Sequence, residues 1–434
     1  MAMKRKTWTR RLMSLYLSVA VLVTAMTGMA TQAQAAPANL DLAARSAILV
    51  EASTGKVLYS NNPDQPLPPA SMSKIMSEYL IQEAVKQKKI SWDDVVPVSE
   101  YAFYVAKISD ASGVYLNAGE SFTVKQLYEA MAIVSANDAT VLLAEKVAGS
   151  ESNFVQMMNK KAAELGMTNT SFVTSTGLPA NELGPYSVDT DQTENLMSAR
   201  DSAILARALI RDFPEALEVS KVPRFTFRAG SPQELKKANY NWMLPGLNSF
   251  YEGVDGLKTG YTDAAKYCFT GTAERDGMRL ISVVMGTESN TKRFVETKKM
   301  FDYGFSNFKL TKQMDKGASI AGFESAPLTN GVELTVPVVT GSEVKMLTKI
   351  GAETKFTPTV TFQQLAAPIA KDQVVGKLVL KEEGVQESDY LQKEDMEKAS
   401  FDVVAAQEVE EASWIRLFFR SIIQFFSGLF SSGK

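Results

Sequence analysis

The chain has 434 residues, a formal net charge of −3, and a composition that is 45% hydrophobic and 22% charged, which is typical of globular proteins with one or two sizeable cores. It has no histidine and one cysteine, which excludes Ser-His-Asp and Cys-His catalysis, histidine or multi-thiolate metal sites and an internal disulfide. The near-zero charge gives no electrostatic basis for nucleic-acid binding, and we expect neither a metal nor a cofactor.

The N-terminus carries the three parts of a secretory signal peptide. Residues 1–11 contain five basic residues and no acid, residues 12–29 are largely apolar, and Ala33-Gln34-Ala35 has the small-x-small pattern of a cleavage site. We expect residues 1–35 to be removed before Ala36 and the mature protein to act outside the bacterial cytoplasm. The alternative is an uncleaved membrane anchor, because the apolar run is almost long enough to span a bilayer.

Residues 36–308 alternate strand-like and helix-like patterns. Residues 47–51 and 57–59 predict one hairpin, and residues 267–274 and 278–285 predict a second. Segments with a helical period lie between the hairpins or after them, at 71–87, 125–148, 153–165, 198–211 and 291–305. Strands at both ends with helices between them predict an α+β domain whose sheet joins the two hairpins.

Residues 309–383 differ in composition from the preceding part. Short segments rich in strand-forming residues, at 332–339, 356–362 and 376–380, alternate with stretches that hold Gly, Asn, Asp and Lys. This pattern predicts a small, separate all-β domain. Residues 384–411 are acidic and are predicted to form a linker.

Residues 412–434 predict an amphipathic helix. Polar residues recur every three or four positions from Ser413 to Ser431, and aromatic and aliphatic residues fill a wide opposite face. Arg416 and Arg420 lie in the polar stripe, which favours a helix lying in the membrane plane with its arginines at anionic headgroups. The alternatives are packing on the protein's own core and, for part of the apolar face, self-association with a second copy.

The first candidate for chemistry is Ser71-Met72-Ser73-Lys74. On a helix Ser71 and Lys74 share one face, and the first turn brings the serine near the positive end of the helix dipole. A partly desolvated lysine can have a pKa low enough to act as a general base. The pattern alone is weak, because Ser-x-x-Lys occurs six times in the chain.

Two further motifs follow it in order. Ser135-Ala136-Asn137 lies inside the predicted helix over 125–148, and Lys258-Thr259-Gly260 precedes the second predicted hairpin. Ser-x-x-Lys, Ser-x-Asn and Lys-Thr-Gly in this order form the motif set of active-site-serine β-lactamases and penicillin-binding proteins.

On these motifs the chain resembles the low-molecular-mass penicillin-binding proteins, which are serine-type D-alanyl-D-alanine carboxypeptidases, and in particular those of Gram-positive bacilli. Residues 47–56, 197–201 and 255–260 also look like blocks of that family. The resemblance covers essentially the whole mature chain. It implies a catalytic domain of the penicillin-binding-protein and β-lactamase type, followed by the small all-β domain and the C-terminal amphipathic helix.

The resemblance also implies residue roles. Ser71 would be the nucleophile that forms an acyl-enzyme, Lys74 its general base, and Ser135 the relay of a proton to the leaving D-alanine. Residues that bind the substrate would be Asn137, Lys258, Thr259, Tyr261 and Arg293. Asn137 would hold the substrate amide. The terminal carboxylate would be bound by Lys258 and Thr259, with help from Arg293. The backbone N–H groups of Ser71 and Tyr261 would form the oxyanion hole.

Some features depart from the pattern or have a plainer interpretation. Tyr261 stands where some relatives have a histidine, so the pH dependence and the deacylation rate stay open. The Glu-x-x-Leu-Asn pattern of class A β-lactamases is missing, so we expect a long-lived penicilloyl adduct rather than fast hydrolysis. Arg293 can also be an exposed arginine at a helix start, and Cys268 a small buried apolar residue.

The resemblance therefore implies an exported enzyme that removes the terminal D-alanine from peptidoglycan pentapeptide stems and is acylated by β-lactam antibiotics. We expect it on the outer face of the cytoplasmic membrane, tethered by its C-terminal helix. A D,D-endopeptidase that cuts peptidoglycan cross-links stays open on the same chemistry. A β-lactamase and a catalytically inactive wall-binding module are further alternatives.

Overall fold

The computed structural model describes residues 39–187, 191–395 and 400–431, and for residues 424–431 the description is confined to the backbone. The predicted export signal, residues 1–35, lies outside the described residues. Within the described ranges, no helix is both long enough and apolar enough to cross a membrane.

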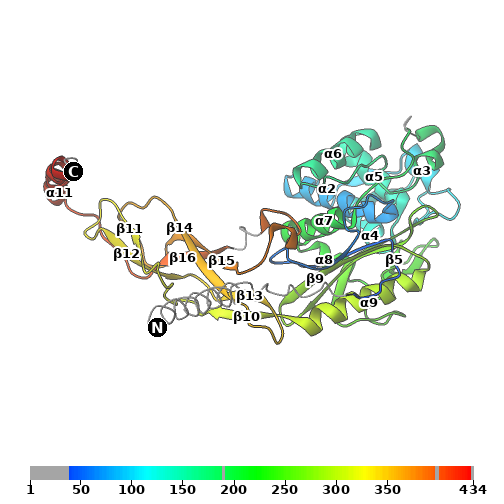
Figure 1. Ribbon diagram of the computed structural model, residues 1–434. Helices are drawn as coiled ribbons and strands as arrows, with labels where there is room; N and C mark the ends of the chain where they lie inside the picture. The colour runs from blue at the N-terminus through cyan, green and yellow to red at the C-terminus, as the bar shows by residue number, and fades with distance from the viewer. Residues whose placement is uncertain (1–38, 188–190, 396–399, 432–434) are drawn as a thin grey trace, which may run out of the picture. The chain divides into compact units, whose positions relative to one another are not determined.

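The first domain is built on a five-stranded antiparallel sheet of order β2-β1-β9-β8-β7 (Figure 1). Its strands are β1 (Ser46–Glu51), β2 (Val57–Asn61), β7 (Val254–Thr262), β8 (Lys266–Arg275) and β9 (Met278–Thr287). Both predicted hairpins are confirmed, and β1 pairs with β9, so the sheet joins the two ends of the domain as expected. Strand β7 is not predicted by the sequence pattern, because Gly256 and Gly260 interrupt its alternation.

Helices cover both faces of this sheet (Figure 1). Successive strand residues point to opposite faces. Ile48 and Val50 of β1 therefore pack in the core beneath the helices of the first half of the domain, while Ala47 and Leu49 pack beneath α9 (Asn290–Asn307). Burial of each large aliphatic side chain contributes about 1.5–3 kcal/mol, so the two cores make the sheet a rigid base for the site.

The helical layer is centred on α2 (Lys74–Lys86), which is buried nearly all round. Such a helix is expected to be apolar on every face, yet Lys74, Ser77, Glu78 and Gln82 are among its buried residues. The other elements of this layer are η1 (Ala70–Ser73), β3 (Val95–Pro97), α3 (Glu100–Val105), β4 (Ser121–Thr123), α4 (Val124–Val134), α5 (Asn137–Ala148), α6 (Glu151–Glu164), η2 (Ala180–Tyr186), α7 (Ala199–Asp212), α8 (Ala216–Ser220), β5 (Arg224–Phe227) and β6 (Leu235–Ala238).

The single helix predicted over 125–148 is wrong, because α4 and α5 are separate helices. Ser135 between them has a left-handed backbone with φ 58°, and Ala136 is extended. The apolar period continues through both helices, so the pattern does not reveal the break. A non-glycine residue in the left-handed region costs on the order of 1 kcal/mol or more, and such residues gather at functional sites.

The second domain is all-β, as predicted. It contains a five-stranded antiparallel sheet of order β11-β12-β16-β15-β14 and a two-stranded ribbon, β10-β13. The elements are β10 (Phe308–Met314), β11 (Ser325–Pro327), β12 (Thr335–Thr340), β13 (Val344–Lys349), β14 (Phe356–Phe362), β15 (Val374–Glu382), η3 (Glu387–Asp389) and β16 (Ser400–Ala405). Its own core holds aliphatic side chains such as Val338, Leu378 and Val403.

The linker predicted over 384–411 is wrong. Strand β16 is the middle strand of the second sheet, and the segment before it contacts the first domain. Leu391 donates its N–H to Gly55 O (2.7 Å), and Arg207 donates to Asp395 Oδ1 (2.7 Å), whose side chain is 1% exposed. The acidic composition suggested a solvated chain, but Arg207 and Lys56 of the first domain pair with carboxylates of this region and of β15.

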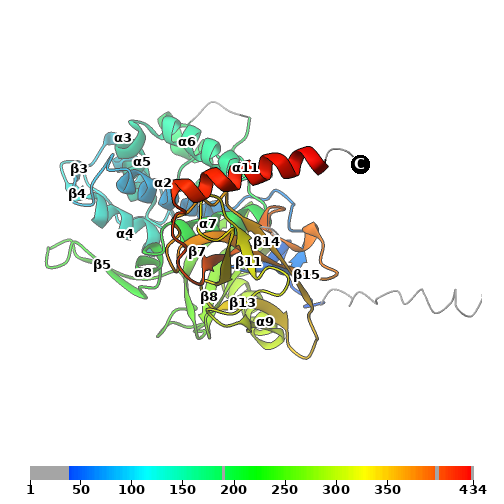
Figure 2. The same ribbon diagram turned by 90° about the vertical axis from the view of Figure 1, so that its left-hand side faces the viewer.

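The C-terminal helix predicted over 412–434 is present as α11 (Trp414–Ser431), drawn in red in Figure 2. Most of its large apolar side chains within the described part are exposed, including Trp414 (76%) and Ile423 (68%), whereas Leu417 is half-buried. Arg420 donates to the backbone O of Gly331 (2.9 Å) in the second domain. This exposure contradicts, for residues 414–423, the alternative in which the helix packs its apolar face on the protein's own core.

Candidate active site

The side chains of Ser71 and Lys74 meet where the 3₁₀ turn η1 enters helix α2. The first turn of the helix predicted over 71–87 is therefore 3₁₀ and not α-helical. A 3₁₀ turn eclipses side chains three positions apart, and the Lys74 Nζ lies 3.0 Å from the Ser71 Oγ. The two side chains are in contact, as their spacing predicts.

Lys74 is completely buried among three oxygen atoms. Besides the Ser71 Oγ, its Nζ lies 2.5 Å from Asn137 Oδ1 and 2.6 Å from the backbone O of Thr176. Burial, and after it the positive charge of Lys258, lowers the pKa of Lys74 well below its ordinary value. A neutral amine has two N–H donors and one lone pair. Donation to Asn137 and Thr176 therefore leaves the lone pair for the Ser71 hydroxyl, whose proton it can accept.

The carbonyl group of Thr176 belongs to a segment that no sequence motif marked. Asn195 fixes this segment by donating through Nδ2 to the backbone O of Thr174 (2.9 Å). Gly177 has φ 79°, and a Cβ on it would lie 1.9 Å from the backbone O of Ala70. The segment therefore presses directly on η1, and only glycine fits at this position. The local sequence signal for this segment is the pair Thr176-Gly177, and such a pair is too common in protein sequences to mark a functional site.

Ser135 and Asn137 lie at the break between α4 and α5. The backbone N–H of Asn137 donates to Ser112 O (2.8 Å), while its side chain meets Lys74. The Ser135 Oγ is buried and has no hydrogen-bond partner among the described residues. A buried hydroxyl without a partner costs about 1–3 kcal/mol. Its position in the lining of a cavity with Ser71 identifies it as a group available to a bound molecule.

The Lys-Thr-Gly motif lies on the edge strand β7, which packs against η1. A Cβ on Gly260 would lie 2.3 Å from the backbone O of Pro69, so the glycine permits the close approach of the strand to the Ser71 turn. Thr259 lines the same cavity as Ser71. Lys258 is 3% exposed, and its Nζ makes one hydrogen bond within the described chain, to Thr259 O at 3.5 Å. Burial lowers the pKa of Lys258.

The cavity between these elements has a volume of about 250 Å³. It brings together side chains from η1, the α4–α5 break, the 177–178 segment, β7 and α9, which are far apart in the sequence. The residues that line it are Ser71, Asp110, Ala111, Ser112, Ser135, Asn137, Gly177, Leu178, Tyr240, Thr259, Gly260, Tyr261, Tyr267, Asn290 and Arg293. Six of the eight residues predicted for the site thus face one cavity. Of the other two, Lys74 contacts Ser71 and Asn137 of this lining, and Lys258 is not among the lining residues.

Arg293 is 5% exposed, so its interpretation as an exposed arginine is wrong. Its Nη1 donates to the backbone O of Gly260 (3.0 Å) and of Cys268 (3.3 Å), and its Nε has no partner among the described residues. Burial lowers its pKa to about 10, which leaves it charged at neutral pH. Tyr261 lines the cavity beside it, with a half-exposed ring whose hydroxyl donates to Asp263 Oδ1 (3.0 Å).

Cys268 lies on β8 opposite Gly260, in the strand after the Lys-Thr-Gly motif. Its side chain is completely buried, and burial raises the pKa of its thiol to about 11. The prediction of a small buried apolar residue is confirmed, because a thiol in this state is not an effective nucleophile.

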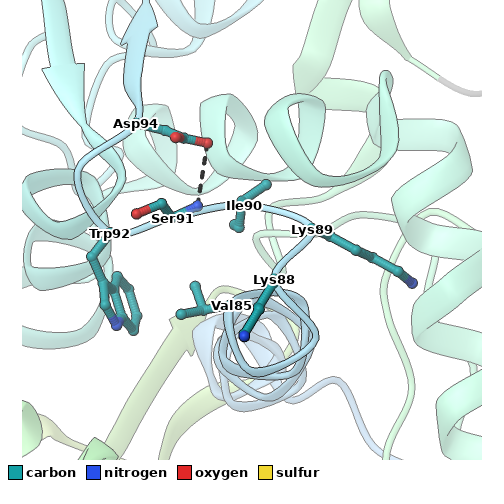
Figure 3. Close-up of a pocket in the computed structure, with 7 residues that line it drawn as sticks. All are labelled: Val85, Lys88, Lys89, Ile90, Ser91, Trp92 and Asp94. Atoms are coloured by element: carbon teal, nitrogen blue, oxygen red, sulfur yellow. Dashed lines mark hydrogen bonds between the residues drawn. The ribbon is translucent and has the colours of Figure 1, made fainter.

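A different surface pocket, of about 310 Å³, lies at the end of α2 (Figure 3). Figure 3 shows Trp92, Ile90 and Val85 around it, with Asp94 accepting a hydrogen bond from the backbone N–H of Ser91 (3.2 Å). None of the residues predicted for the site lines this pocket. The chemistry is therefore assigned to the cavity at Ser71.

Two family models match the chain. Residues 30–289 match the peptidase S11 family, described as D-alanyl-D-alanine carboxypeptidase, and residues 308–411 match the C-terminal domain of penicillin-binding protein 5. The second match begins at the start of β10 and includes β16, in agreement with the corrected extent of the second domain.

Individual proteins are similar over most of the chain. The D-alanyl-D-alanine carboxypeptidase DacF of Bacillus subtilis is 37% identical over 401 residues, which are 90% of this chain and 96% of that protein. The crystal structure of PBP3 from Streptococcus pneumoniae, titled a peptidoglycan synthesis regulatory factor, matches with a TM-score of 0.76 and 34% identity over 85% of this chain and 99% of that one. Penicillin-binding protein D2 of Listeria monocytogenes, in its ampicillin-bound form, matches with a TM-score of 0.53 and 35% identity over 62% of this chain and 100% of that one.

Proposed function

The chain belongs to the peptidase S11 family of D-alanyl-D-alanine carboxypeptidases, and from this premise we propose how its own residues carry the reaction. It is a serine-type carboxypeptidase that removes the terminal D-alanine from peptidoglycan pentapeptide stems through an acyl-enzyme. The observation that supports the assignment of the nucleophile is the 3.0 Å contact between Ser71 Oγ and a buried Lys74 amine of lowered pKa.

In the acylation step, Ser71 Oγ attacks the carbonyl carbon of the penultimate D-alanine while the lone pair of Lys74 takes the hydroxyl proton. The oxyanion that forms accepts hydrogen bonds from the backbone N–H groups of Ser71 and Tyr261, each worth about 3 kcal/mol in such a site. The peptide C–N bond then breaks. The proton passes from Lys74 through the Ser135 hydroxyl to the leaving nitrogen, and free D-alanine departs.

In the deacylation step, water attacks the ester carbonyl of the acyl-enzyme and gives its proton to Lys74, and the ester bond to Ser71 breaks with return of that proton to Oγ. The unpartnered Ser135 Oγ supports its role as the relay, since it lines the same cavity as the nucleophile. No carboxylate base is needed for these steps. The neutral Lys74 amine accepts the proton of Ser71 in acylation and the proton of water in deacylation.

Recognition of the substrate is assigned to Asn137, Thr259 and Arg293, which line the cavity, and to Lys258. The terminal carboxylate would accept from Thr259 and from Arg293, whose Nε has a free donor within the described chain. Lys258 would supply a fixed positive charge nearby, and Asn137 would hold the substrate amide. A carboxylate that leaves water needs such compensation by charged donors.

Penicillin acylates the enzyme at the same serine. The chain shares this class of ligand with its relatives, among which the Listeria protein was solved with ampicillin and with cefotaxime bound. A β-lactam carries a carboxylate and a strained amide, so it can use the same residues as the peptide. We propose that its ester with Ser71 is long-lived, because the class A deacylation motif is missing from the sequence.

The test is release of D-alanine from a diacyl-Lys-D-Ala-D-Ala peptide by the mature protein, with Ser71→Ala beside it. Wild-type release and none from Ser71→Ala establish the reaction and its nucleophile together. Covalent capture of penicillin without release would contradict the proposed substrate and favour cross-linked muropeptides, the substrate of an endopeptidase.

We propose further that the protein is exported by residues 1–35 and held at the outer face of the membrane by α11. The exposed apolar side chains of residues 414–423 support the second part, because an in-plane helix buries such a face in the acyl boundary. We propose self-association with a second copy only for the part of this face that the membrane leaves uncovered.

A further inference from the structure

A segment without helix or strand lines part of the cavity at Ser71. Residues 110–112 contribute to the lining, and the chain then continues as irregular backbone to residue 116. We call residues 110–116 the arch. Buried backbone N–H and C=O groups need hydrogen-bond partners. Because the arch is not part of a helix or a sheet, other elements have to supply these partners and thereby set its shape.

The first two residues of α5 bind the backbone of the arch. The backbone N–H of Asn137 donates to Ser112 O (2.8 Å). The carboxyl group of Asp138 is completely buried and accepts from two backbone N–H groups of the arch, at 3.1–3.2 Å. The side chain of Asn137 also contacts Lys74 Nζ (2.5 Å). A displacement of the arch therefore reaches the general base through a single residue.

Two cations of the β5-β6 hairpin bind the carbonyl groups of the arch. Arg228, directly after β5, donates through Nη1 to Val114 O (2.8 Å) and through Nη2 to Tyr115 O (3.0 Å). Lys237 of β6 donates to Gly113 O (2.8 Å). Three successive carbonyl groups are thus bound by charged donors, which form stronger hydrogen bonds than neutral donors do.

Arg228 is itself held firmly. Its side chain is 7% exposed, and its Nε donates to Glu120 Oε1 (2.9 Å). Its Cζ lies 5.1 Å from the ring centroid of Phe122 and 4.8 Å from that of Phe227. The backbone of Arg228 is left-handed, with φ 53°, a conformation that persists in a non-glycine residue only where the surroundings impose it. Neither Arg228 nor Lys237 is among the described residues that line the cavity, and the proposed mechanism uses neither.

We propose that Arg228 is a positioning residue for the reaction at Ser71. It holds the arch against the start of α5, and the arch in turn fixes Asn137 beside Lys74 and forms part of the cavity wall. The guanidinium carries its donors in a planar fork, so it binds two adjacent carbonyl groups and Glu120 at the same time, which a lysine cannot do. This inference rests on the proposed function, because the expected effect is on that reaction.

The test is Arg228→Met, which removes the donors and keeps a long apolar side chain over the two rings. The arch should shift, and kcat for D-alanine release should fall on the order of 10²-fold, as for a misplacement near 1 Å. KM should change much less, because Thr259 and Arg293, which are proposed to bind the substrate carboxylate, lie on β7 and α9. Rates are expressed per active site, counted by penicillin labelling to completion, so that unfolded protein does not enter the comparison.

Arg224→Met is the matched control, because Arg224 is exposed at the start of the same hairpin. It should keep both kcat and KM. Arg228→Lys restores the charge without the fork and should recover only part of the lost rate. If Arg228→Met fails to fold, Lys237→Met decides the question, since it removes one hydrogen bond to the arch and should lower kcat by a smaller factor.

Hydrogen exchange gives a readout that needs no substrate. The backbone N–H groups of residues 114 and 116, which donate to Asp138, should exchange faster in Arg228→Met than in wild type and in the control. Unchanged exchange, an unchanged kcat per active site or a loss confined to KM would overturn the proposal and leave Arg228 a residue of the fold alone. If wild type captures penicillin but releases no D-alanine, the proposed substrate fails, and the rate of penicillin acylation then decides the role of Arg228.

Discussion

At the scale of single residues, the chemistry depends on how burial changes an ordinary lysine. An exposed lysine is charged at neutral pH and cannot accept a proton. Lys74 is completely buried beside Lys258, and both conditions lower its pKa. Its two carbonyl-type acceptors then direct the lone pair at Ser71.

Lys74→Arg tests this account. Arginine keeps donors for Asn137 and Thr176 but stays protonated, so it cannot act as a base. We expect the rate of penicillin acylation to fall by about 10²–10⁴-fold, measured by mass spectrometry of the adduct over time. In wild type, the rate should fall as the pH drops through the lowered pKa of Lys74, because the proton then occupies the lone pair.

The matched control is Lys86→Arg, at the exposed end of the same helix, which should acylate at the wild-type rate. Acylation of Lys74→Arg at that rate would show that another group takes the proton of Ser71.

At the scale of elements, the site exists because three backbone segments approach one another closely. The break at Ser135 turns the chain between α4 and α5, and the glycines at 177 and 260 let their segments reach the turn that carries Ser71. The two glycines carry no catalytic group, yet they set the distances between the groups that do.

Gly260→Ala tests the approach of β7 to η1. A Cβ would meet the backbone O of Pro69 at 2.3 Å, so the strand or the turn has to shift. We expect acylation by penicillin to slow by about 10²-fold, the cost of a misplacement near 1 Å.

Gly149→Ala is the comparison, because that glycine has φ 78° but open space around it. It should lose about 1 kcal/mol of stability by urea unfolding and keep its acylation rate. Equal acylation rates in both variants would mean that close packing at Gly260 does not position the site.

At the scale of the whole molecule, the second domain is joined to the first by more than the chain connection at Phe308. Arg207 of α7 reaches Asp395, and Arg200 donates to the backbone O of Tyr390 and of Leu391 (both 3.3 Å). Beyond the second domain, α11 begins after Ala412, whose N–H donates to Asn330 O (2.8 Å).

Deleting residues 413–434 tests the tether and leaves Ala412 in place. The shortened mature protein should release D-alanine at the wild-type rate but no longer sediment with vesicles that contain an anionic lipid. The full mature chain should sediment, and less so at high salt, because Arg416 meets charged headgroups; Arg420, which the sequence also placed there, instead donates to the backbone O of Gly331. Sedimentation of the shortened protein to the same extent would assign membrane binding to another part of the chain.

Much of this protein can be predicted from local patterns. Hairpins at both ends of the first domain, most of its helices, the all-β character of the second domain and the contact of Ser71 with Lys74 all follow from periods and spacings of a few residues. The patterns fail where the cause is distant. The helix break at Ser135 is set by packing, β7 is stabilised by its neighbours in spite of its glycines, and the acidic segment before β16 finds its cations on another domain.

By itself, the sequence determined which groups are present: a serine with a lysine one turn away, the second and third motifs in order, and the absence of histidine that makes a lysine the base. Tertiary structure decided what those groups can do. It buried Lys74 and Lys258, turned Arg293 inward and brought the Thr176 carbonyl group to the Lys74 amine. Burial and the approach of charges depend on segments far apart in the chain, and no local pattern contains them.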